Sequence, residues 1–269
     1  MLKQRLLTAI ILIPFFILLL FKLSAQAFYF FTLLIVAWGA WEWSSFMELK
    51  RFLYSLAYML ITIFSLFIVS LFPLIFVLCI TSVWWLAAAF LVMRYPRNSA
   101  AWGGGTVLRG IMGLFVLVPC WLAVNFLRND SSHGISILLF LFVLIWGADS
   151  GAYFFGKKWG KHKLIPQVSP GKTWQGLFGA LLITAVLAPL GLSFFNVPHL
   201  AWPIALLWTF LTVLFSILGD LFESMLKRQA GLKDSGHLLP GHGGILDRID
   251  SLTAAAPIFA LGLIISHWI

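Results

Sequence analysis

Long apolar runs separated by short polar segments dominate the chain. Each run is close to the roughly 20 residues that a helix needs to cross a bilayer. The nine runs cover residues 6–22, 26–47, 53–71, 74–93, 110–127, 135–155, 176–195, 201–222 and 251–268. None of them alternates apolar and polar residues with the period of two expected of barrel strands. The pattern predicts an all-α, polytopic integral membrane protein with about nine transmembrane helices.

The composition supports this prediction and removes several alternatives. The 269 residues are 61% hydrophobic, 16% aromatic and only 10% charged, with a mean hydropathy of +1.00. An ordinary soluble domain is about 25% charged. A soluble enzyme, a disordered chain and a nucleic-acid-binding domain are thereby excluded, and no nucleic-acid partner is expected. The spans leave no room for a second soluble domain, so we expect a single membrane domain over residues 1–269.

The first run also has features of a secretory signal peptide. Lys3 and Arg5 precede it, and Ala25-Gln26-Ala27 follows it like a cleavage site. However, the run is long for a signal core and further spans follow at once, which favours an uncleaved first helix. The sequence leaves both interpretations open.

Positive charges are distributed unevenly between the two sides of the predicted bundle. With a cytoplasmic N-terminus, 16 of the 18 Lys and Arg residues fall in cytoplasmic segments, and only Lys22 and Arg128 fall on the opposite side. Loops rich in Lys and Arg stay on the cytoplasmic side. The count therefore predicts a cytoplasmic N-terminus and supports an odd number of spans. Part of the net charge of +9 then reflects orientation and contact with anionic lipid headgroups.

Acidic residues are concentrated in the second half of the chain. Six of the nine lie between the sixth run and the start of the ninth. They are Asp149, Asp220, Glu223, Asp234, Asp247 and Asp250. We therefore expect residues 1–130 to be mainly scaffold spans and residues 135–269 to form the catalytic half. Its active site would lie on the cytoplasmic side, where the loops 156–175 and 223–250 are long.

A carboxylate, a hydroxyl and an ammonium group share one stripe near the end of the eighth run. On a helix, Asp220, Ser224 and Lys227 fall within about 60° of one another. A carboxylate at this depth costs at least about 2.5 kcal/mol unless it faces the bundle interior, a partner or a metal. The pattern is equally consistent with a helix-end ion pair between Asp220 and Lys227 or Arg228.

The segment 231–244 is rich in glycine, which lets backbone amides approach a ligand closely. Together with Lys233 and His242 it could cradle a phosphate, although His242 could equally be a metal ligand or a turn residue. Asp247 and Asp250 follow, and if the stretch 245–250 is already helical, they are neighbours at a spacing of three residues at a helix N-terminus. A carboxylate at a helix N-terminus complements the helix dipole and contributes about 0.3–1 kcal/mol. This effect is sufficient to explain one of the two carboxylates.

Dipole complementation does not explain why four aspartates and four cations gather around this segment. They are Asp220, Asp234, Asp247, Asp250, Lys227, Arg228, Lys233 and Arg248. Mg²⁺ typically takes oxygen ligands from one or two carboxylates together with substrate phosphates. Lys and Arg side chains neutralise the remaining phosphate charge. The mixture therefore predicts a site for a metal-bound polyphosphate.

Two further features bear on this site. Asp149 lies inside the sixth run, where a charge is usually functional, although pairing with another helix is an alternative. The segment 168–176 ends its basic loop with Gly-Lys-Thr but lacks the spacing and preceding strand of a P-loop, which we reject. There Ser169 and Thr173 are candidate helix caps and Lys172 a candidate phosphate contact.

Glu42 is the acidic residue of the first half that falls within an apolar run. It lies near the predicted cytoplasmic end of the second run. Contact with a lipid headgroup and a hydrogen-bonded structural role are both consistent with this position, because a carboxylate at this depth needs one or the other.

The segment 224–250 resembles the signature of the phosphatidate cytidylyltransferase (CDP-diacylglycerol synthase) family. The matching pattern is Ser224-x-x-Lys227-Arg228-x4-Lys233-Asp234-x5-Pro240-x-His242-Gly243-Gly244-x-x-Asp247-Arg248-x-Asp250. Segments 149–153 and 169–174 also resemble motifs of this family, so the similarity is strong over roughly residues 140–269. One departure is Gln175, where many members carry Glu.

The resemblance implies transfer of CMP from CTP to phosphatidate, giving CDP-diacylglycerol and pyrophosphate in phospholipid biosynthesis. It also implies Mg²⁺ dependence, with one or two metal ions, and a homodimer in the bacterial inner membrane. The implied catalytic residues are Asp220, Ser224, Lys227 and Asp247. The implied substrate-binding residues are Lys172, Arg228, Lys233, His242 and Arg248. The implied metal ligands are Asp220 and Asp247, with Asp149 and Asp250 as further candidates.

A secondary transporter is the alternative from a different class. It would also have many spans and intramembrane carboxylates such as Asp149 and Asp220. Against it, the polar residues gather on one face instead of lining a path through the midplane, and no internal repeat is evident.

Overall fold

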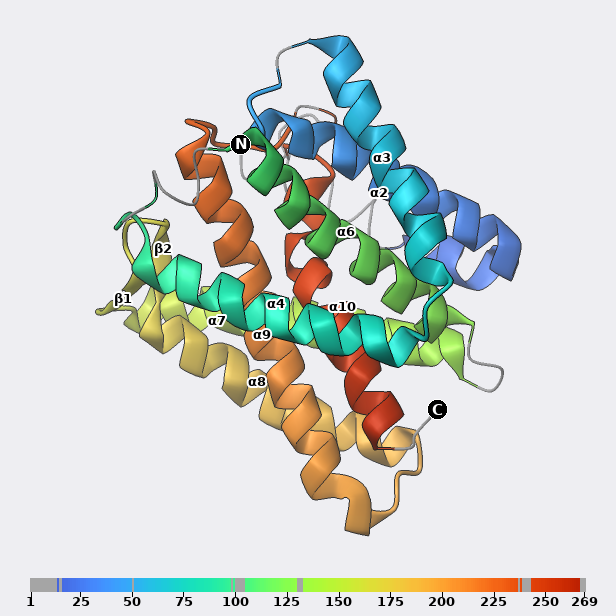
Figure 1. Cartoon of the computed structure of the whole chain (residues 1–269). Helices are drawn as coiled ribbons and strands as arrows, with labels where there is room; N and C mark the ends of the chain where they lie inside the picture. Colours follow the sequence, from blue (N-terminus) through green and yellow to red (C-terminus); the bar gives the residue numbers. More distant parts are fainter. Residues whose placement is uncertain are drawn as a thin grey trace.

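The computed structural model describes residues 14, 16–49, 51–97, 99, 105–129, 133–236, 238 and 243–266 (Figure 1). Its long helices are α2 (Ala25–Phe46), α3 (Phe52–Ser70), α4 (Leu74–Arg94), α6 (Thr106–Arg128), α7 (Gly134–Trp159), α8 (Trp174–Phe194), α9 (Trp202–Gln229) and α10 (Leu246–Ile265). A short 3₁₀ helix, His199–Ala201, precedes α9. An antiparallel hairpin of β1 (Lys163–Ile165) and β2 (Ser169–Thr173) connects α7 to α8.

The helices confirm the prediction of an all-α polytopic membrane protein. Seven of them are long and apolar enough to cross a membrane. These are all the long helices except α2, and α9 is counted together with the 3₁₀ turn before it. Helix α2 matches the predicted run 26–47. The first predicted run, 6–22, lies mostly outside the described residues, of which 14 and 16–22 are helical. Nine spans therefore remain a prediction.

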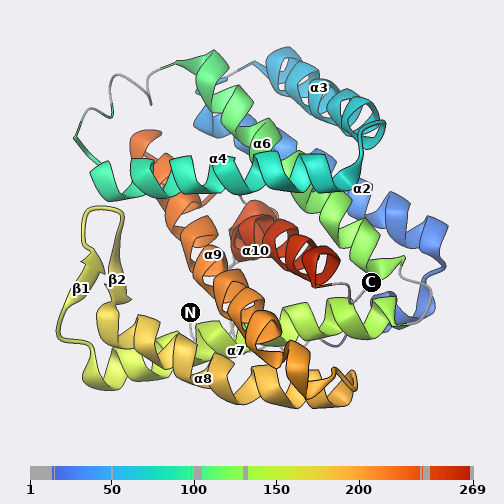
Figure 2. The same cartoon turned by 60° about the horizontal axis from the view of Figure 1, so that its bottom comes forward.

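Helix α10 occupies the centre of the molecule (Figure 2). It packs most extensively against α9 and also contacts α2, α4, α6 and α7. Small residues in its sequence, including the run Thr253–Ala256, permit this close approach. On α9, Gly219 faces the Asp250 carbonyl so closely that a Cβ would collide with it. The end of α9, with Asp220 and Glu223, is thereby held beside the start of α10, with Asp247 and Asp250.

The outer helices expose large apolar side chains. Phe64 and Phe67 on α3, and Phe76 and Leu86 on α4, are each more than 60% exposed. Water would penalise apolar surface of this extent, whereas hydrocarbon does not. This surface is typical of helices that face lipid, in agreement with the membrane prediction.

Two polar segments differ from the prediction. The loop expected over 223–250 is shorter, because α9 continues to Gln229 and α10 already begins at Leu246. The longer α9 is favoured electrostatically, because Lys227 and Arg228 lie in its last turn and complement the helix dipole. The loop expected over 156–175 contains the β1–β2 hairpin. Its strands are too short for an alternating pattern to reveal them, but Val168 between them is fully buried in the core.

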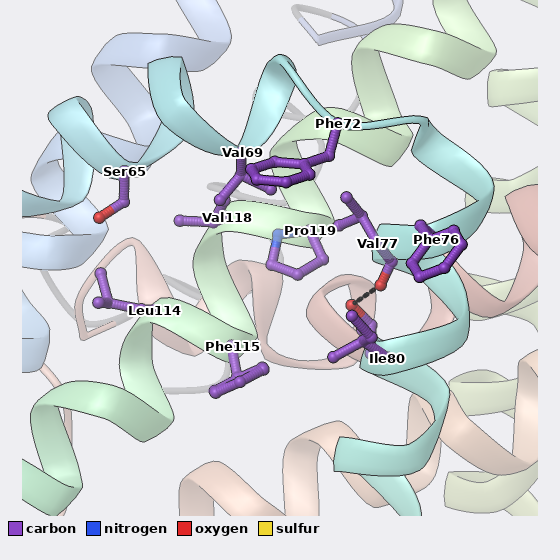
Figure 3. Close-up of a pocket in the computed structure, with 11 residues that line it drawn as sticks. Ser65, Val69, Phe72, Phe76, Val77, Ile80, Leu114, Phe115, Val118 and Pro119 are labelled. Carbon is purple, nitrogen blue, oxygen red and sulfur yellow. Dashed lines mark hydrogen bonds between the residues drawn. The ribbon is translucent and has the colours of Figure 1, made fainter.

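An apolar pocket of about 390 Å³ lies between α3, α4 and α6 (Figure 3). Its walls include Val69, Phe72, Phe76, Leu114 and Phe115. No charged side chain lines it. Because an anion there would find no counter-charge, this pocket is not a candidate for phosphate chemistry.

Candidate active site

The stripe predicted on α9 is partly confirmed. The hydroxyl of Ser224 donates to Asp220 Oδ1 at 3.2 Å. Asp220 also forms an ion pair with Lys172, whose Nζ lies 2.8 Å from Oδ2. The alternative of a helix-end pair between Asp220 and Lys227 or Arg228 is therefore wrong, because the hairpin, 45 or more residues earlier in the chain, supplies the cation.

Lys172 is positioned by the hairpin and the start of α8. It lies in β2, and its ammonium group also donates to the Ile217 carbonyl of α9 at 3.4 Å. The next residue, Thr173, caps α8 by accepting the Gly176 N–H at 3.1 Å, as predicted. The predicted cap at Ser169 is wrong, because Ser169 pairs with Ile165 within the hairpin. Lys172 is thus anchored between two structural elements.

A pocket of about 140 Å³ with a mixed polar and apolar lining adjoins this ion pair. Asp149 and Tyr153 of α7 line it together with Lys172, Thr173 and Ile217. Asp149 also interacts electrostatically with Asp220 and Lys172. The carboxylate of the sixth run therefore belongs to the same neighbourhood as Asp220, as the prediction required.

Lys227 lies between two buried carboxylates. Its Nζ is 2.6 Å from Asp247 Oδ1 of α10 and 3.2 Å from Glu223 Oε1 of its own helix. The exposed fraction is 10% for the Lys227 side chain, 9% for Asp247 and 4% for Glu223. Sequence reasoning assigned Glu223 no role, although its spacing of four residues from Lys227 is the spacing of a helical ion pair.

The second oxygen of Asp247 organises the loop between α9 and α10. Oδ2 accepts the N–H and the hydroxyl of Ser235, each at 2.9 Å, and the N–H of Gly244 at 2.8 Å. Gly243 adopts a φ of +80°, and a Cβ on it would collide with Asp247 Oδ2. The glycine-rich sequence is therefore needed for the backbone to wrap around this carboxylate.

We expect Gly243→Ala to lower activity at least about tenfold, because the methyl group displaces the Asp247 carboxylate. The left-handed backbone adds a strain of about 1–2 kcal/mol. Gly231→Ala is the matched control, since Gly231 has a φ of +68° in the same loop but open space around its Cα. Turnover and thermal unfolding of both variants measure the two effects. Equal activity losses in the two variants would show that the contact with Asp247 is unimportant.

The cluster contains more negative than positive charge. Asp250 accepts the Ser251 N–H at 2.7 Å and interacts electrostatically with Asp220, Lys172 and Lys227. The contacts described above connect five carboxylates with two ammonium groups. These are Asp149, Asp220, Glu223, Asp247 and Asp250, with Lys172 and Lys227. Fully ionised, such a cluster would attract further cations.

Within the described ranges, no three His, Cys, Asp or Glu side chains are arranged to hold a metal ion by themselves. A metal ion at this site would therefore need oxygen ligands from elsewhere. Substrate phosphates are the usual source for Mg²⁺.

Three other predicted substrate-binding residues lie at the protein surface. Arg228, Lys233 and Arg248 are exposed, on the last turn of α9, the following loop and the first turn of α10, respectively. His242 lies outside the described residues. Among the predicted cations, Lys172 pairs with Asp220, and Lys227 pairs with Glu223 and Asp247.

Gln175, the departure from the family pattern, supports the hairpin. Its side-chain oxygen accepts the N–H groups of Lys161 and His162 at 3.1 and 3.2 Å. Either a glutamine or a glutamate oxygen can accept these bonds, so the substitution leaves this contact possible.

Fold and site define a class of protein: a helical membrane protein with a partly buried cluster of carboxylates and lysines where the end of α9 and the start of α10 meet α7 and the hairpin. The chain belongs to the cytidylyltransferase family, whose sequence model matches residues 3–265. It is 42% identical to a Pseudomonas aeruginosa protein named phosphatidate cytidylyltransferase, over 100% of this chain and 99% of the relative. A Haemophilus influenzae protein of the same name is 40% identical over 97% of this chain and 98% of its own length. The family predicted from the signature is therefore confirmed.

Proposed function

We propose that the protein is a nucleotidyltransferase that transfers CMP from CTP to phosphatidate, giving CDP-diacylglycerol and pyrophosphate for phospholipid biosynthesis. The proposal depends chiefly on the end-to-end similarity, at 42% and 40% identity, to two proteins named for this activity. The partly buried cluster supports it, because lysines and carboxylates beside a glycine-rich loop suit a metal-bound triphosphate.

The reaction needs charge neutralisation more than a general base. An oxygen of the phosphatidate phosphate attacks the α-phosphorus of CTP, and the bond from that phosphorus to the β-phosphate oxygen breaks. A phosphate monoester has a second pKa of about 6, so the attacking group is already anionic at neutral pH. The obstacles are the repulsion between two anions and the charge on the leaving pyrophosphate. Positioned cations reduce the repulsion between the two substrates and stabilise the negative charge on the leaving pyrophosphate.

The lysines of the cluster are placed for these tasks. Lys172 lies beside the pocket lined by Asp149 and Tyr153, and we assign it to the phosphatidate headgroup. Lys227, between Glu223 and Asp247, would neutralise a CTP phosphate. The remaining phosphate contacts would come from residues at the cluster's edge and the loop. These are Arg228, Lys233, His242 and Arg248.

The donor set fits Mg²⁺, a hard cation that prefers oxygen. We propose that Asp220 and Asp247 hold the ion, that substrate phosphates supply its other ligands, and that Asp149 and Asp250 are further candidate ligands. Ser224 would keep Asp220 oriented through its 3.2 Å hydrogen bond. The excess of carboxylates over lysines leaves charge for a second ion. When bound, Mg²⁺ would supply positive charge at the triphosphate and the leaving pyrophosphate.

The membrane arrangement follows from the charge distribution. We propose that the N-terminus and the active site face the cytoplasm of a bacterium, in its inner membrane, as the excess of Lys and Arg on that side supports. CTP would then enter from the cytosol while the acyl chains of phosphatidate stay in the bilayer. We further propose a homodimer, which a mass measurement in detergent tests.

The test is product formation from labelled CTP by the purified protein in vesicles containing phosphatidate. We expect the label to enter the lipid phase, a metal chelator to reduce turnover to background, and added Mg²⁺ to restore it. A secondary transporter would yield no lipid-soluble nucleotide. Vesicles without phosphatidate are the control, and label in their lipid phase would contradict the assigned acceptor. Full turnover in the presence of chelator would contradict the metal assignment.

A further inference from the structure

Glu42 lies far from the acidic cluster in sequence but next to it in the fold. It belongs to α2 and is only 4% exposed. Its carboxylate accepts four hydrogen bonds of 2.9–3.2 Å. The donors are the N–H groups of Ile245 and Leu246, the hydroxyl of Ser235 and the indole of Trp38. Of the two interpretations left open by the sequence, the hydrogen-bonded one is confirmed.

These bonds hold the start of α10. The N-cap residue of this helix, Ile245, provides no side-chain cap. Glu42 takes that role from another helix, because it accepts two of the first amides that have no partner within α10. Its negative charge also suits the positive end of the helix dipole. A Cβ on Gly236 would lie 2.6 Å from Glu42 Oε1, so the loop is packed directly against this carboxylate.

Ser235 connects Glu42 to Asp247. Its hydroxyl oxygen is 3.0 Å from Glu42 Oε2 and 2.9 Å from Asp247 Oδ2, and the residue is buried. A hydroxyl carries one proton, so it donates to one carboxylate at a time. The two carboxylates together accept four backbone N–H groups of this region. Asp247 accepts those of Ser235 and Gly244, and Glu42 accepts those of Ile245 and Leu246.

We propose that Glu42 is a positioning residue, which fixes the Asp247 carboxylate through Ser235 and the first amides of α10. Its effect on catalysis rests on the proposed function, whereas its effect on the loop does not. A purely structural role would loosen only the amides that Glu42 binds itself. A positioning role would also loosen the amides bound by Asp247.

The test compares Glu42→Gln with the unmodified protein by hydrogen exchange at single-residue resolution and by steady-state kinetics. The amide side chain keeps one acceptor oxygen but presents N–H groups to a donor. We expect faster exchange at Ser235 and Gly244 as well as at Ile245 and Leu246. We also expect kcat to fall about 10- to 100-fold with little change in KM for CTP. Glu48→Gln is the control, because it removes a carboxylate that pairs with the buried Arg109 at 2.8 Å and not with the α9–α10 loop; exchange at Ser235 and Gly244 and kcat should both stay unchanged.

Ser235→Ala keeps the test decisive if Glu42→Gln folds poorly. It removes only the shared hydroxyl and should lower kcat in the same direction, and the double variant should be no slower than Glu42→Gln alone. Leu138→Ala, in the core of α7, controls for a general loss of stability. Faster exchange confined to Ile245 and Leu246, with unchanged kcat, would overturn the proposal. If the unmodified protein makes no product, the proposed function fails, and the exchange data alone decide the role of Glu42.

Discussion

Asp247→Asn is expected to lower the rate of CDP-diacylglycerol formation on the order of a thousandfold. In the folded protein one oxygen of this carboxylate accepts a hydrogen bond from the ammonium group of Lys227, and the other accepts three hydrogen bonds from the loop. An asparagine can satisfy the loop donors with its oxygen, but it then presents an N–H group to Lys227. Both the ion pair and the proposed metal ligand are lost.

The variant should remain folded in detergent, because Glu223 still pairs with Lys227. Size-exclusion elution and thermal unfolding check this point, and labelled-CTP turnover measures the rate. Glu48→Gln, which also removes one carboxylate from an ion pair, that with the buried Arg109, serves as the control for the loss of a single negative charge. Undiminished turnover in a folded Asp247→Asn variant would remove this residue from the active site.

Local periodicity predicted the features of this fold that depend on neighbouring residues. Eight apolar runs coincide with helices, because an apolar stretch of about 20 residues has few other stable conformations in a membrane. The contact between Asp220 and Ser224 follows from the helical repeat in the same way. The start of α10 at Leu246 lies ahead of the apolar run 251–268, because its first turns carry Asp247, Arg248 and Asp250 in place of apolar residues.

The partners of the acidic residues were not predictable, because they come from distant segments. The charge pattern was equally consistent with a pair between Asp220 and a cation of its own helix, but Lys172 reaches it from a hairpin too short to detect. Glu42 looked like an isolated carboxylate of a scaffold span, yet it binds the loop that carries the family signature. The first half of the chain is therefore more than scaffold.

Lys227→Met is expected to destabilise the protein and to abolish its activity. The substitution leaves Glu223 and Asp247 facing each other without the cation that both contact, in a site where neither is more than 9% exposed. Removing one partner from a buried ion pair typically costs about 3–5 kcal/mol, because the remaining charge stays buried without compensation. The neighbouring Arg228→Met, at an exposed cation of the same turn, should change the free energy of unfolding by no more than about 0.5 kcal/mol.

A second substitution separates the structural effect from the catalytic one. In Lys227→Met/Glu223→Gln, one of the two uncompensated carboxylates is neutralised, so part of the lost stability should return. Activity should not return, because the cation proposed to neutralise a CTP phosphate is still absent. Thermal unfolding and labelled-CTP turnover of the single and double variants measure both quantities. Recovery of turnover along with stability would show that Lys227 serves only to balance the buried carboxylates, and that the triphosphate is neutralised elsewhere.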